Sequence, residues 1–330
     1  MLHREAAEKF INETARPFEK AVYDVLYNNH PVDRALMELR EFQNEDGGFG
    51  HGLEADNWNP NSNPIATNDA IIWLYRMNAF SSAKDIVEGI VRYLESHDSF
   101  DEDEKKWLFA IESNKDYPHA SWWEKNDSGI CGFNPTVSLA TFMICYGSRD
   151  ALYEEILRDA LSYLKIADTM LGDSLKCYLL SYELLKEHGI TDIIDLDVLR
   201  KLLSDWIVKT ICPDIEKYGV EYVTAPSDIF SGMYMKFVSE EIKPMIKAEL
   251  DIIGKLQKED GGFDISWQWY TEYEEFHQAR IWWRPRVTLE KLLFVKEMSN
   301  GEASDFRINC GKGTANSSIN FNLQEDSKCL

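Results

Sequence analysis

The chain has 330 residues and a formal charge of −22, from 57 acidic and 35 basic side chains. A charge of this sign repels nucleic acid and anionic lipid surfaces at long range, which argues against a nucleic-acid-binding function. Hydrophobic residues make up 44% of the chain and aromatic residues 12%. This is enough to fill a large core and line a cavity, and it excludes intrinsic disorder for most of the chain.

The amino-terminal stretch that begins Met1-Leu2-His3 is charged and amphipathic, so we expect no secretory signal. The chain contains no run of about 18 apolar residues, so the sequence predicts no membrane span. The six cysteines form no Cys-x-x-Cys pair, which favours free, reduced thiols. We therefore expect a soluble cytoplasmic protein, whose oligomeric state the sequence leaves open.

Apolar residues recur at helical spacing through most of residues 4–299, and alternation with a period of two is scarce. This pattern predicts an all-α domain over residues 1–299. Short joints between successive helices permit antiparallel hairpins. The expected helices lie near residues 4–28, 32–43, 65–79, 82–97, 135–147, 149–166, 172–188, 195–211, 244–257 and 285–299.

Three longer irregular segments interrupt the helical pattern, at residues 44–64, 98–134 and 258–284. Loops of this length in a compact domain are usually functional, and most of the tryptophans lie in them or beside them. From Asn300 onward the composition changes to small and polar residues. We expect residues 300–330 to form a disordered tail.

One motif, Gln-x-x-Asp-Gly-Gly-Phe, occurs twice, over residues 43–49 and 257–263. Each copy ends an apolar helical stretch, and paired glycines supply the backbone freedom for a sharp exit. Internal repetition of this kind is typical of repeat architectures, in which units bury their apolar faces against neighbours.

The motif resembles the repeat of the terpenoid cyclase and protein prenyltransferase superfamily. The resemblance implies an α/α toroid, a ring of antiparallel helical hairpins with long loops at one mouth of a central cavity. In the cyclases the motif ends with tryptophan, whereas this chain has Phe49 and Phe263. The Asp-x-Asp-Asp and Asp-Asp-x-x-Asp motifs of that superfamily are missing. The resemblance is thus to a branch without the usual acid or metal motifs, and we expect no cofactor.

A zinc site is the alternative to this metal-free expectation. Protein prenyltransferases hold zinc with Asp, Cys and His, and a thiolate with a His and an Asp is chemically competent to bind it. The chain offers Asp127, Cys131 and His277, at spacings that depart from the pattern of that family.

The first candidate cluster follows the first motif copy directly. His51, Glu54, Asp56 and Trp58 place an imidazole, two carboxylates and an indole close together in sequence. A carboxylate buried beside an indole has a raised pKa and can act as a general acid. The alternative is that Glu54 and Asp56 only cap turns.

The second cluster, His119, Trp122 and Trp123, lies in the longest irregular segment. Adjacent tryptophans point in different directions, so one can pack while the other binds a ring or polyene face. The alternative is that the pair plugs the ring.

The third cluster follows the second motif copy, just as the first cluster follows the first motif copy. Its arginines form a local excess of positive charge that can hold a carboxylate or phosphate. The alternative is that they neutralise Glu272, Glu274 and Glu275. The candidate residues of this cluster are Trp267, Trp269, His277, Arg280, Trp282 and Arg284.

Three functions are compatible with these clusters. The first is metal-independent acid–base chemistry on an isoprenoid-like or other apolar small molecule. Glu54 or Asp56 would transfer the proton, the three histidines would assist, and indoles would stabilise positive charge. The second is a carbohydrate-active enzyme, of glycoside hydrolase or polysaccharide lyase type, with sugar stacking on tryptophan and with Glu54 or Asp56 opposite Asp264 or Glu272 as the paired carboxylates. The third is a non-catalytic ring that binds a peptide, lipid or protein. A closed apolar chamber favours the first function and an open groove with facing carboxylates favours the second.

Overall fold

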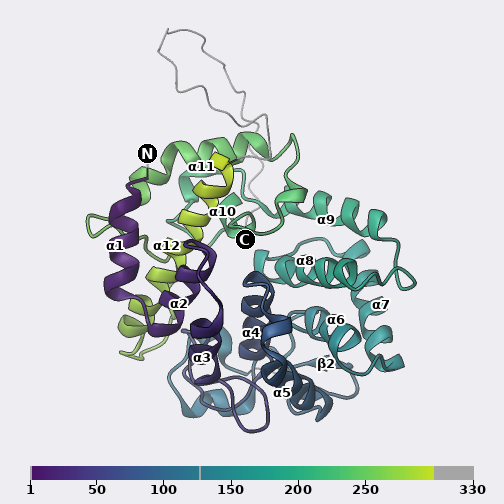
Figure 1. The fold of residues 1–330 in the computed structure, drawn as a ribbon. Helices are drawn as coiled ribbons and strands as arrows, with labels where there is room; N and C mark the ends of the chain where they lie inside the picture. The colour runs from purple at the N-terminus through teal and green to yellow at the C-terminus, as the bar shows by residue number, and fades with distance from the viewer. Residues whose placement is uncertain (1, 126–127, 301–330) are drawn as a thin grey trace.

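The structure is a computed structural model that describes residues 2–125 and 128–300 (Figure 1). It is predominantly α-helical, as the periodicity predicts. The helices are α1 Arg4–Thr14, α2 Pro17–Leu26, α3 Asp33–Arg40, α4 Pro64–Arg76, α5 Lys84–Glu95, α6 Thr136–Tyr146, α7 Ala151–Ile166, α8 Gly172–Glu187, α9 Leu196–Thr210, α10 Pro226–Ile229, α11 Lys243–Leu256 and α12 Phe276–Asn300. Within the described residues no helix combines the length and apolarity needed to cross a membrane. The proposed tail lies, from residue 301 on, outside the described residues.

Two helix predictions were wrong in extent. The single helix expected over residues 4–28 is divided into α1 and α2, because Arg16 is extended and Pro17 starts a new helix. The last helix begins at Phe276 rather than Pro285, so part of the irregular segment at 258–284 is helical. Pro285 lies inside α12 and has no N–H to donate to the carbonyl of Ile281, one turn earlier. Ile281 is exposed to solvent.

The irregular segment over residues 98–134 contains little regular structure. Two two-residue strands, β1 Phe100–Asp101 and β2 Lys106–Trp107, pair antiparallel. Short 3₁₀ turns follow at Glu112–Asp116 and Ser121–Trp123. The segment thus remains a loop in character, as the sequence predicts.

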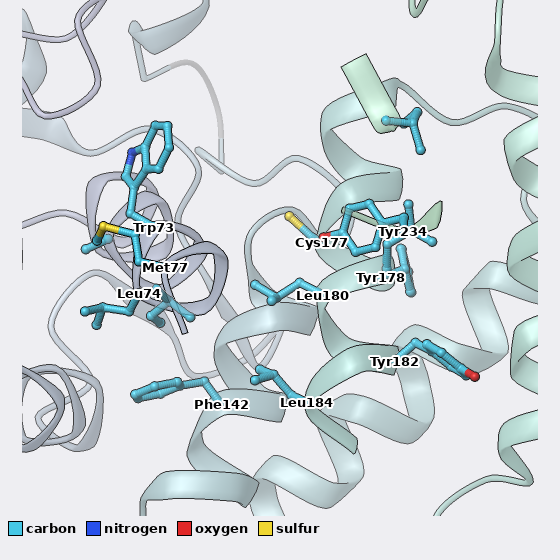
Figure 2. Close-up of a cluster of buried hydrophobic side chains, with 14 of the residues drawn as sticks. Trp73, Leu74, Met77, Phe142, Cys177, Tyr178, Leu180, Tyr182, Leu184 and Tyr234 are labelled. Atoms are coloured by element: carbon cyan, nitrogen blue, oxygen red, sulfur yellow. The ribbon is translucent and has the colours of Figure 1, made fainter. Parts of the chain in front are cut away.

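The hydrophobic core lies between helices that are buried on nearly all sides. Every residue of α6 from Thr136 to Ile144 is buried, and a helix without an exposed polar face belongs to the interior. Figure 2 shows Trp73 and Leu74 of α4 grouped with Phe142 of α6 and with Leu180 and Leu184 of α8. Helices α7 and α9 pack on the outer sides of α6 and α8. The interior helices thereby bring their polar residues toward the middle of the molecule.

The first motif copy forms a tight turn that is tied to α5. Gln43 Nε2 donates to the Gly47 carbonyl at 2.9 Å and to the Ile86 carbonyl at 3.2 Å. The Gly48 amide donates to Asp46 Oδ1 at 2.9 Å. The glutamine therefore closes its own turn and fixes the turn to α5.

The second copy repeats this geometry against the start of the chain. Gln257 Nε2 donates to the Gly261 carbonyl at 2.8 Å and to the His3 carbonyl at 3.0 Å. The Gly262 amide donates to Asp260 Oδ1 at 3.0 Å. Because His3 precedes α1, the second motif fastens the two ends of the fold together, and α1 packs along α12.

Each motif phenylalanine also bonds to the helix that follows its loop. The Phe49 amide donates to Thr67 Oγ1 of α4 at 3.1 Å, and the Phe263 amide donates to Thr288 Oγ1 of α12 at 2.9 Å. Helices α4 and α12 are therefore equivalent in the two repeats.

We expect Gly261→Ala to lower the free energy of unfolding by roughly 2–5 kcal/mol. About 1–2 kcal/mol comes from the left-handed backbone and about 1–3 kcal/mol from overpacking. Gly261 has φ +91°, and an added Cβ would lie 2.3 Å from the Ala6 carbonyl oxygen. Urea denaturation followed by circular dichroism measures the loss.

Gly189→Ala is the matched control, since Gly189 has φ +64° but no atom within 4 Å of the added Cβ. It should lose only the backbone contribution of about 1–2 kcal/mol. Equal losses in the two variants would contradict the close approach of the second motif to α1.

Candidate active site

The loops that carry the three sequence clusters meet in space. The Ala120 amide donates to the Asp56 carbonyl at 2.9 Å, which joins the second loop to the first. The Ser121 amide donates to the Trp269 carbonyl at 2.9 Å, which joins the second loop to the third. These loops therefore form one assembly, although they are far apart in sequence.

Much of the aromatic content of the loops forms a packed wall. Trp58 stacks on Trp282 with centroids 4.8 Å apart and meets Trp269 edge-on at 6.4 Å. Trp123 is buried and stacks on Phe109 at 4.7 Å. Trp122 packs against the same cluster. The wall supports the carboxyl groups beside it.

Asp56 is a buried carboxyl group held by indoles. It is 2% exposed, and its Oδ2 accepts from Trp267 Nε1 at 2.9 Å while its Oδ1 accepts from Trp269 Nε1. Burial raises the pKa of Asp56 to about 6, and the hydrogen bonds from Trp269 and Trp267 oppose part of that rise. Among the described residues, no cation forms an ion pair with this carboxylate.

Glu54 is the most strongly perturbed carboxyl group of the predicted clusters. Burial raises its pKa to about 8, and the charges of Asp56 and Asp69 add to the rise. The Asp56 amide lies 3.4 Å from Glu54 Oε1. Glu54 is therefore mostly protonated at neutral pH, which is the state a general acid requires.

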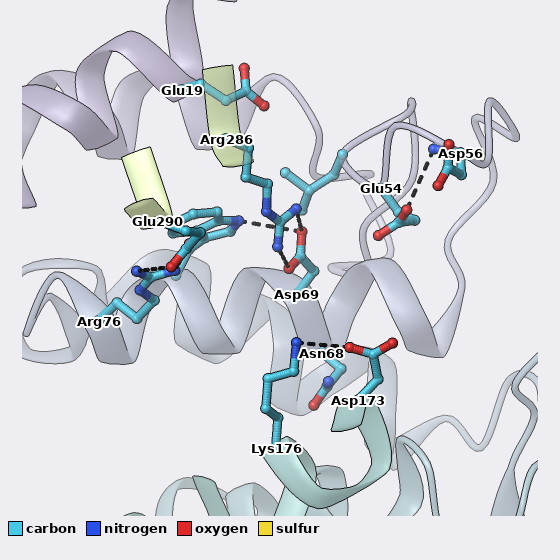
Figure 3. A network of polar contacts seen from close by, with 12 residues as sticks. Glu19, Glu54, Asp56, Asn68, Asp69, Arg76, Asp173, Lys176, Arg286 and Glu290 are labelled. Carbon is cyan, nitrogen blue, oxygen red and sulfur yellow. Dashed lines mark hydrogen bonds and ion pairs between the residues drawn. The ribbon is translucent and has the colours of Figure 1, made fainter. Parts of the chain in front are cut away.

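Asp69 and Arg286 form a nearly buried ion pair beside Glu54 (Figure 3). Arg286 Nη1 and Nη2 donate to the two carboxylate oxygens at 3.0 and 2.6 Å. The guanidinium also lies 4.7 Å from the ring centroid of Trp73 and 4.8 Å from that of Trp283. This bidentate pair links α4 directly to α12.

A second ion pair crosses between the same two helices in the opposite direction. Arg76 of α4 donates through Nη2 to Glu290 Oε2 of α12 at 3.0 Å. Arg76 also bonds the Ser231 carbonyl at 3.0 Å. Thus each helix contributes one acid and one arginine, and the two pairs clamp α4 to α12.

Asp173, Lys176 and Tyr222 lie in the same region, although none of them belongs to a cluster predicted from the sequence. Asp173 and Lys176, in the first turns of α8, form an ion pair at 2.8 Å, and the Tyr222 hydroxyl donates to Asp173. The lysine charge lowers the pKa of Asp173, although surrounding protein opposes this by desolvation. The Asp173 side chain is nevertheless 52% exposed, so solvent reaches it. Only the i,i+3 spacing of Asp173 and Lys176 was visible in the sequence.

The three predicted histidines bond other groups or face solvent. His51 and His277 are exposed, and His51 Nε2 bonds Asn44 Oδ1 at 2.8 Å. His119 is buried, with Nδ1 2.6 Å from the Tyr117 carbonyl. Among the described residues, no imidazole hydrogen-bonds Glu54 or Asp56.

The predicted arginines serve the second motif. Arg280 pairs with Asp264, with Nε 2.8 Å from Oδ1. Arg284 Nη2 donates to Asp260 Oδ1 at 2.8 Å. These arginines therefore pair with Asp264 and Asp260. The sequence alternative had named Glu272, Glu274 and Glu275 as their partners.

The zinc alternative gains no geometric support. Asp127 lies outside the described residues, Cys131 is half-buried, and His277 is exposed at the start of α12. Within residues 2–125 and 128–300, no group of three or more His, Cys, Asp or Glu side chains is arranged to hold a metal ion.

A recess of about 700 Å³ lies beside the first motif turn and is distinct from the carboxyl cluster. Its lining contains no aromatic side chain and neither Glu54 nor Asp173. We therefore place the candidate active site at the carboxyl cluster, where perturbed acids and indoles meet. The lining residues of the recess are Asn44, Glu45, Asp46, Asn61, Ser62, Asp98, Ser99, Ile111, Glu112 and Ser113.

Comparison of the chain with protein-family models, curated proteins and solved structures gives no match.

We expect one glutamate carboxyl signal to titrate near pH 8 in the folded protein, because burial and the charges of Asp56 and Asp69 disfavour ionisation of Glu54. Carbon-13 NMR of glutamate-labelled protein over pH 4 to 10 measures this titration. Glu54→Gln should remove the signal. Asp56→Asn should move its midpoint to lower pH, because one neighbouring negative charge is lost. A Glu54 signal that titrates near pH 4.5 would contradict the assignment.

We expect Asp69→Asn to lower the free energy of unfolding by about 3–5 kcal/mol, since it leaves the Arg286 charge without its partner in a nearly buried site. The same carboxylate-to-amide change at Asp205 is the control. Asp205 pairs with Lys201 at 2.8 Å, but its side chain is 63% exposed, so the loss should be under about 1 kcal/mol. Urea denaturation compares the two, and similar losses would show that the central pair contributes no more than a surface pair.

Proposed function

We propose that this protein is a carbohydrate-active enzyme of the glycoside hydrolase type, with Glu54 as the general acid and Asp173 as its ionised partner. One observation carries the proposal. Glu54, a carboxyl group that is mostly protonated at neutral pH, and Asp173, an ionised and solvent-accessible carboxylate that accepts from the Tyr222 hydroxyl, belong to the same polar network (Figure 3). Two carboxyl groups held in opposite protonation states are what glycoside hydrolysis requires.

We also propose that the helices close into an α/α toroid. Contacts between interior helices support a complete circuit. Phe18 of α2 meets Trp73 of α4 at 5.8 Å, and Ser138 Oγ of α6 donates to Asn68 Oδ1 of α4 at 2.6 Å. Helix α8 packs on α6 and α10, and α12 packs on α10 and α2. In this arrangement α2, α4, α6, α8, α10 and α12 surround the carboxyl cluster.

In the proposed reaction Glu54 donates its proton to the glycosidic oxygen as the bond to the anomeric carbon breaks. The Asp173 carboxylate stabilises the positive charge that develops on the sugar ring, and it accepts a proton from the water molecule whose oxygen bonds to the anomeric carbon and completes hydrolysis. Trp267 and Tyr222 offer partly accessible ring faces beside the two acids, and sugar rings stack on such faces.

The polarity of the site favours a sugar over an isoprenoid. Ionised side chains of Asp173, Lys176 and Arg286 would face an apolar substrate, and a diphosphate group would be repelled by the surrounding carboxylates. A polysaccharide lyase acts on a uronate, whose carboxylate would meet the same repulsion. A purely binding protein has no need of an acid with a pKa as high as that of Glu54.

We expect the full-length protein to cleave at least one member of an array of uncharged and amino oligosaccharides. Glu54→Gln should lower kcat on that substrate by about 10²–10⁴-fold, the usual contribution of a positioned general acid. The same variant should lose much less activity on the dinitrophenyl glycoside of the same sugar, because that leaving group departs without a proton. Activity of the unmodified protein should fall as pH rises through about 8, where Glu54 loses its proton.

Two outcomes would contradict the proposal. One is that no oligosaccharide in the array is cleaved. The other is that Glu54→Gln loses equally on both leaving groups, which would mean that Glu54 has a structural role. Asp205→Asn, on the exposed face of α9, serves as the activity control.

A further inference from the structure

The ring of Trp267 stands nearly at right angles to the rings of Tyr222 and Trp283 beside the carboxyl cluster. Tyr222 and Trp267 have centroids 6.0 Å apart and an interplanar angle of 77°, and Trp267 and Trp283 are 5.1 Å apart at 86°. Tyr222 is 61% exposed, and the two indoles are half-buried. The rings therefore form walls of a corner that remains open to solvent.

The segment that carries Tyr222 is held in place by its own hydrogen bonds. It connects α9 to α10, and the Cys212 amide donates to the Thr224 carbonyl at 2.9 Å. The Tyr218 hydroxyl donates to the Cys212 carbonyl at 2.6 Å. Tyr222 itself bonds Asp173. An exposed aromatic ring fixed at both ends of its segment and through its own hydroxyl is preorganised to bind a ligand.

The charges around this corner leave an excess of carboxyl groups. Asp69, Glu290 and Asp173 each have a cationic partner in an ion pair. Asp56, whose pKa of about 6 leaves it mostly ionised at neutral pH, has no such partner among the described residues, and Glu54 also has none but is mostly protonated at that pH. The corner therefore attracts positive charge and repels negative charge.

Two features of Trp283 fit a ligand that carries both a positive charge and a hydrogen-bond acceptor. Its ring already accepts a cation on one face, since Arg286 lies 4.8 Å from the centroid. Its Nε1 is close enough to Asp56 to lower the pKa of that carboxyl group, but it is buried and makes no hydrogen bond within the described residues. A buried N–H without a partner is costly, and an acceptor on a bound ligand would satisfy it.

We propose that Tyr222, Trp267 and Trp283 form an aromatic cage that binds the ammonium group of the substrate. Faces of electron-rich rings together with unneutralised carboxyl groups are the known chemistry of ammonium recognition. The assignment of the substrate rests on the proposed carbohydrate function. With that function the substrate is an amino sugar, and the hydroxyl groups beside its amine supply the acceptor for Trp283 Nε1.

The cage is tested first without any sugar. Isothermal titration calorimetry compares choline with 3,3-dimethylbutan-1-ol, which has the same shape and no charge. We expect choline to bind about tenfold more tightly, as a desolvated cation–π site provides. Equal affinity, or no binding of choline, would overturn the proposal.

Two substitutions at one position separate the ring from its hydroxyl. Tyr222→Leu removes a wall of the cage and should weaken choline binding by roughly tenfold. Tyr222→Phe keeps the ring and should change the affinity by less than about threefold. Tyr270→Leu, at a tyrosine that is 78% exposed and outside the cage, should leave the affinity unchanged. A loss in Tyr222→Leu no larger than in Tyr270→Leu would overturn the proposal, as would a full loss in Tyr222→Phe.

A sugar series separates failure of the cage from failure of the proposed function. The probes are tetraglucosamine, its fully N-acetylated counterpart and tetragalacturonate. Tightest binding of tetraglucosamine, with loss of that binding in Tyr222→Leu, supports both the ammonium cage and the carbohydrate function.

The other outcomes separate the two proposals. Binding of choline but of none of the three sugars would keep the ammonium cage and overturn its use for amino sugars, and would count against the carbohydrate function. Equal binding of tetraglucosamine and its N-acetylated form would overturn the cage and leave the carbohydrate function standing. Tightest binding of tetragalacturonate would overturn the cage.

Discussion

The Asp69–Arg286 ion pair determines both the packing and the electrostatics of the centre of this protein. Arg286 is close enough to Glu54, Asp56 and Asp173 to lower the pKa of each. Because Asp69 binds the guanidinium through both oxygens, much of that positive charge is neutralised. Glu54 can therefore keep a proton at neutral pH although a buried arginine lies nearby.

The repeated turn explains how residues from opposite ends of the chain reach this pair. The first motif copy fixes the loop that leads into α4, and the second copy fastens the loop before α12 to the start of α1. The same closure brings Trp267 and Trp269 to Asp56. Since both motif phenylalanines bond a threonine of the following helix, the repeat gives α4 and α12 equivalent places, and the two ion pairs join these helices.

The sequence predicted the features of the fold that depend on local patterns. Helical periodicity located most helices, and the motif located the two equivalent turns with Glu54 and Asp56 beside one of them. The errors also have local causes. Pro17 starts a new helix inside a stretch whose apolar spacing predicts one continuous helix. Pro285 lies inside α12, although proline usually begins or breaks a helix.

The rest of the site depends on contacts that leave no local pattern. Asp69 lies on a helix that reads as ordinary core sequence, and its partner Arg286 is 217 positions away. Asp173 is an unremarked acid in the first turn of α8, and Tyr222 belongs to a connection without a motif. By contrast, His51 and His277 were conspicuous in sequence but are exposed. Chemical type alone thus identified candidates, whereas burial and long-range pairing decide which of them share one site.

The two proposals for this site are connected through the pKa of Glu54. A general acid works best when its pKa is near the working pH, and the value of about 8 for Glu54 is above neutrality. An ammonium group bound beside Glu54 and Asp56 would stabilise the ionised form of both and lower their pKa values. The cationic substrate would then bring the acid toward neutrality at the moment when the proton must leave it. An uncharged sugar would have no such effect, so the excess of carboxyl groups would favour the amino sugar in the chemical step as well as in binding.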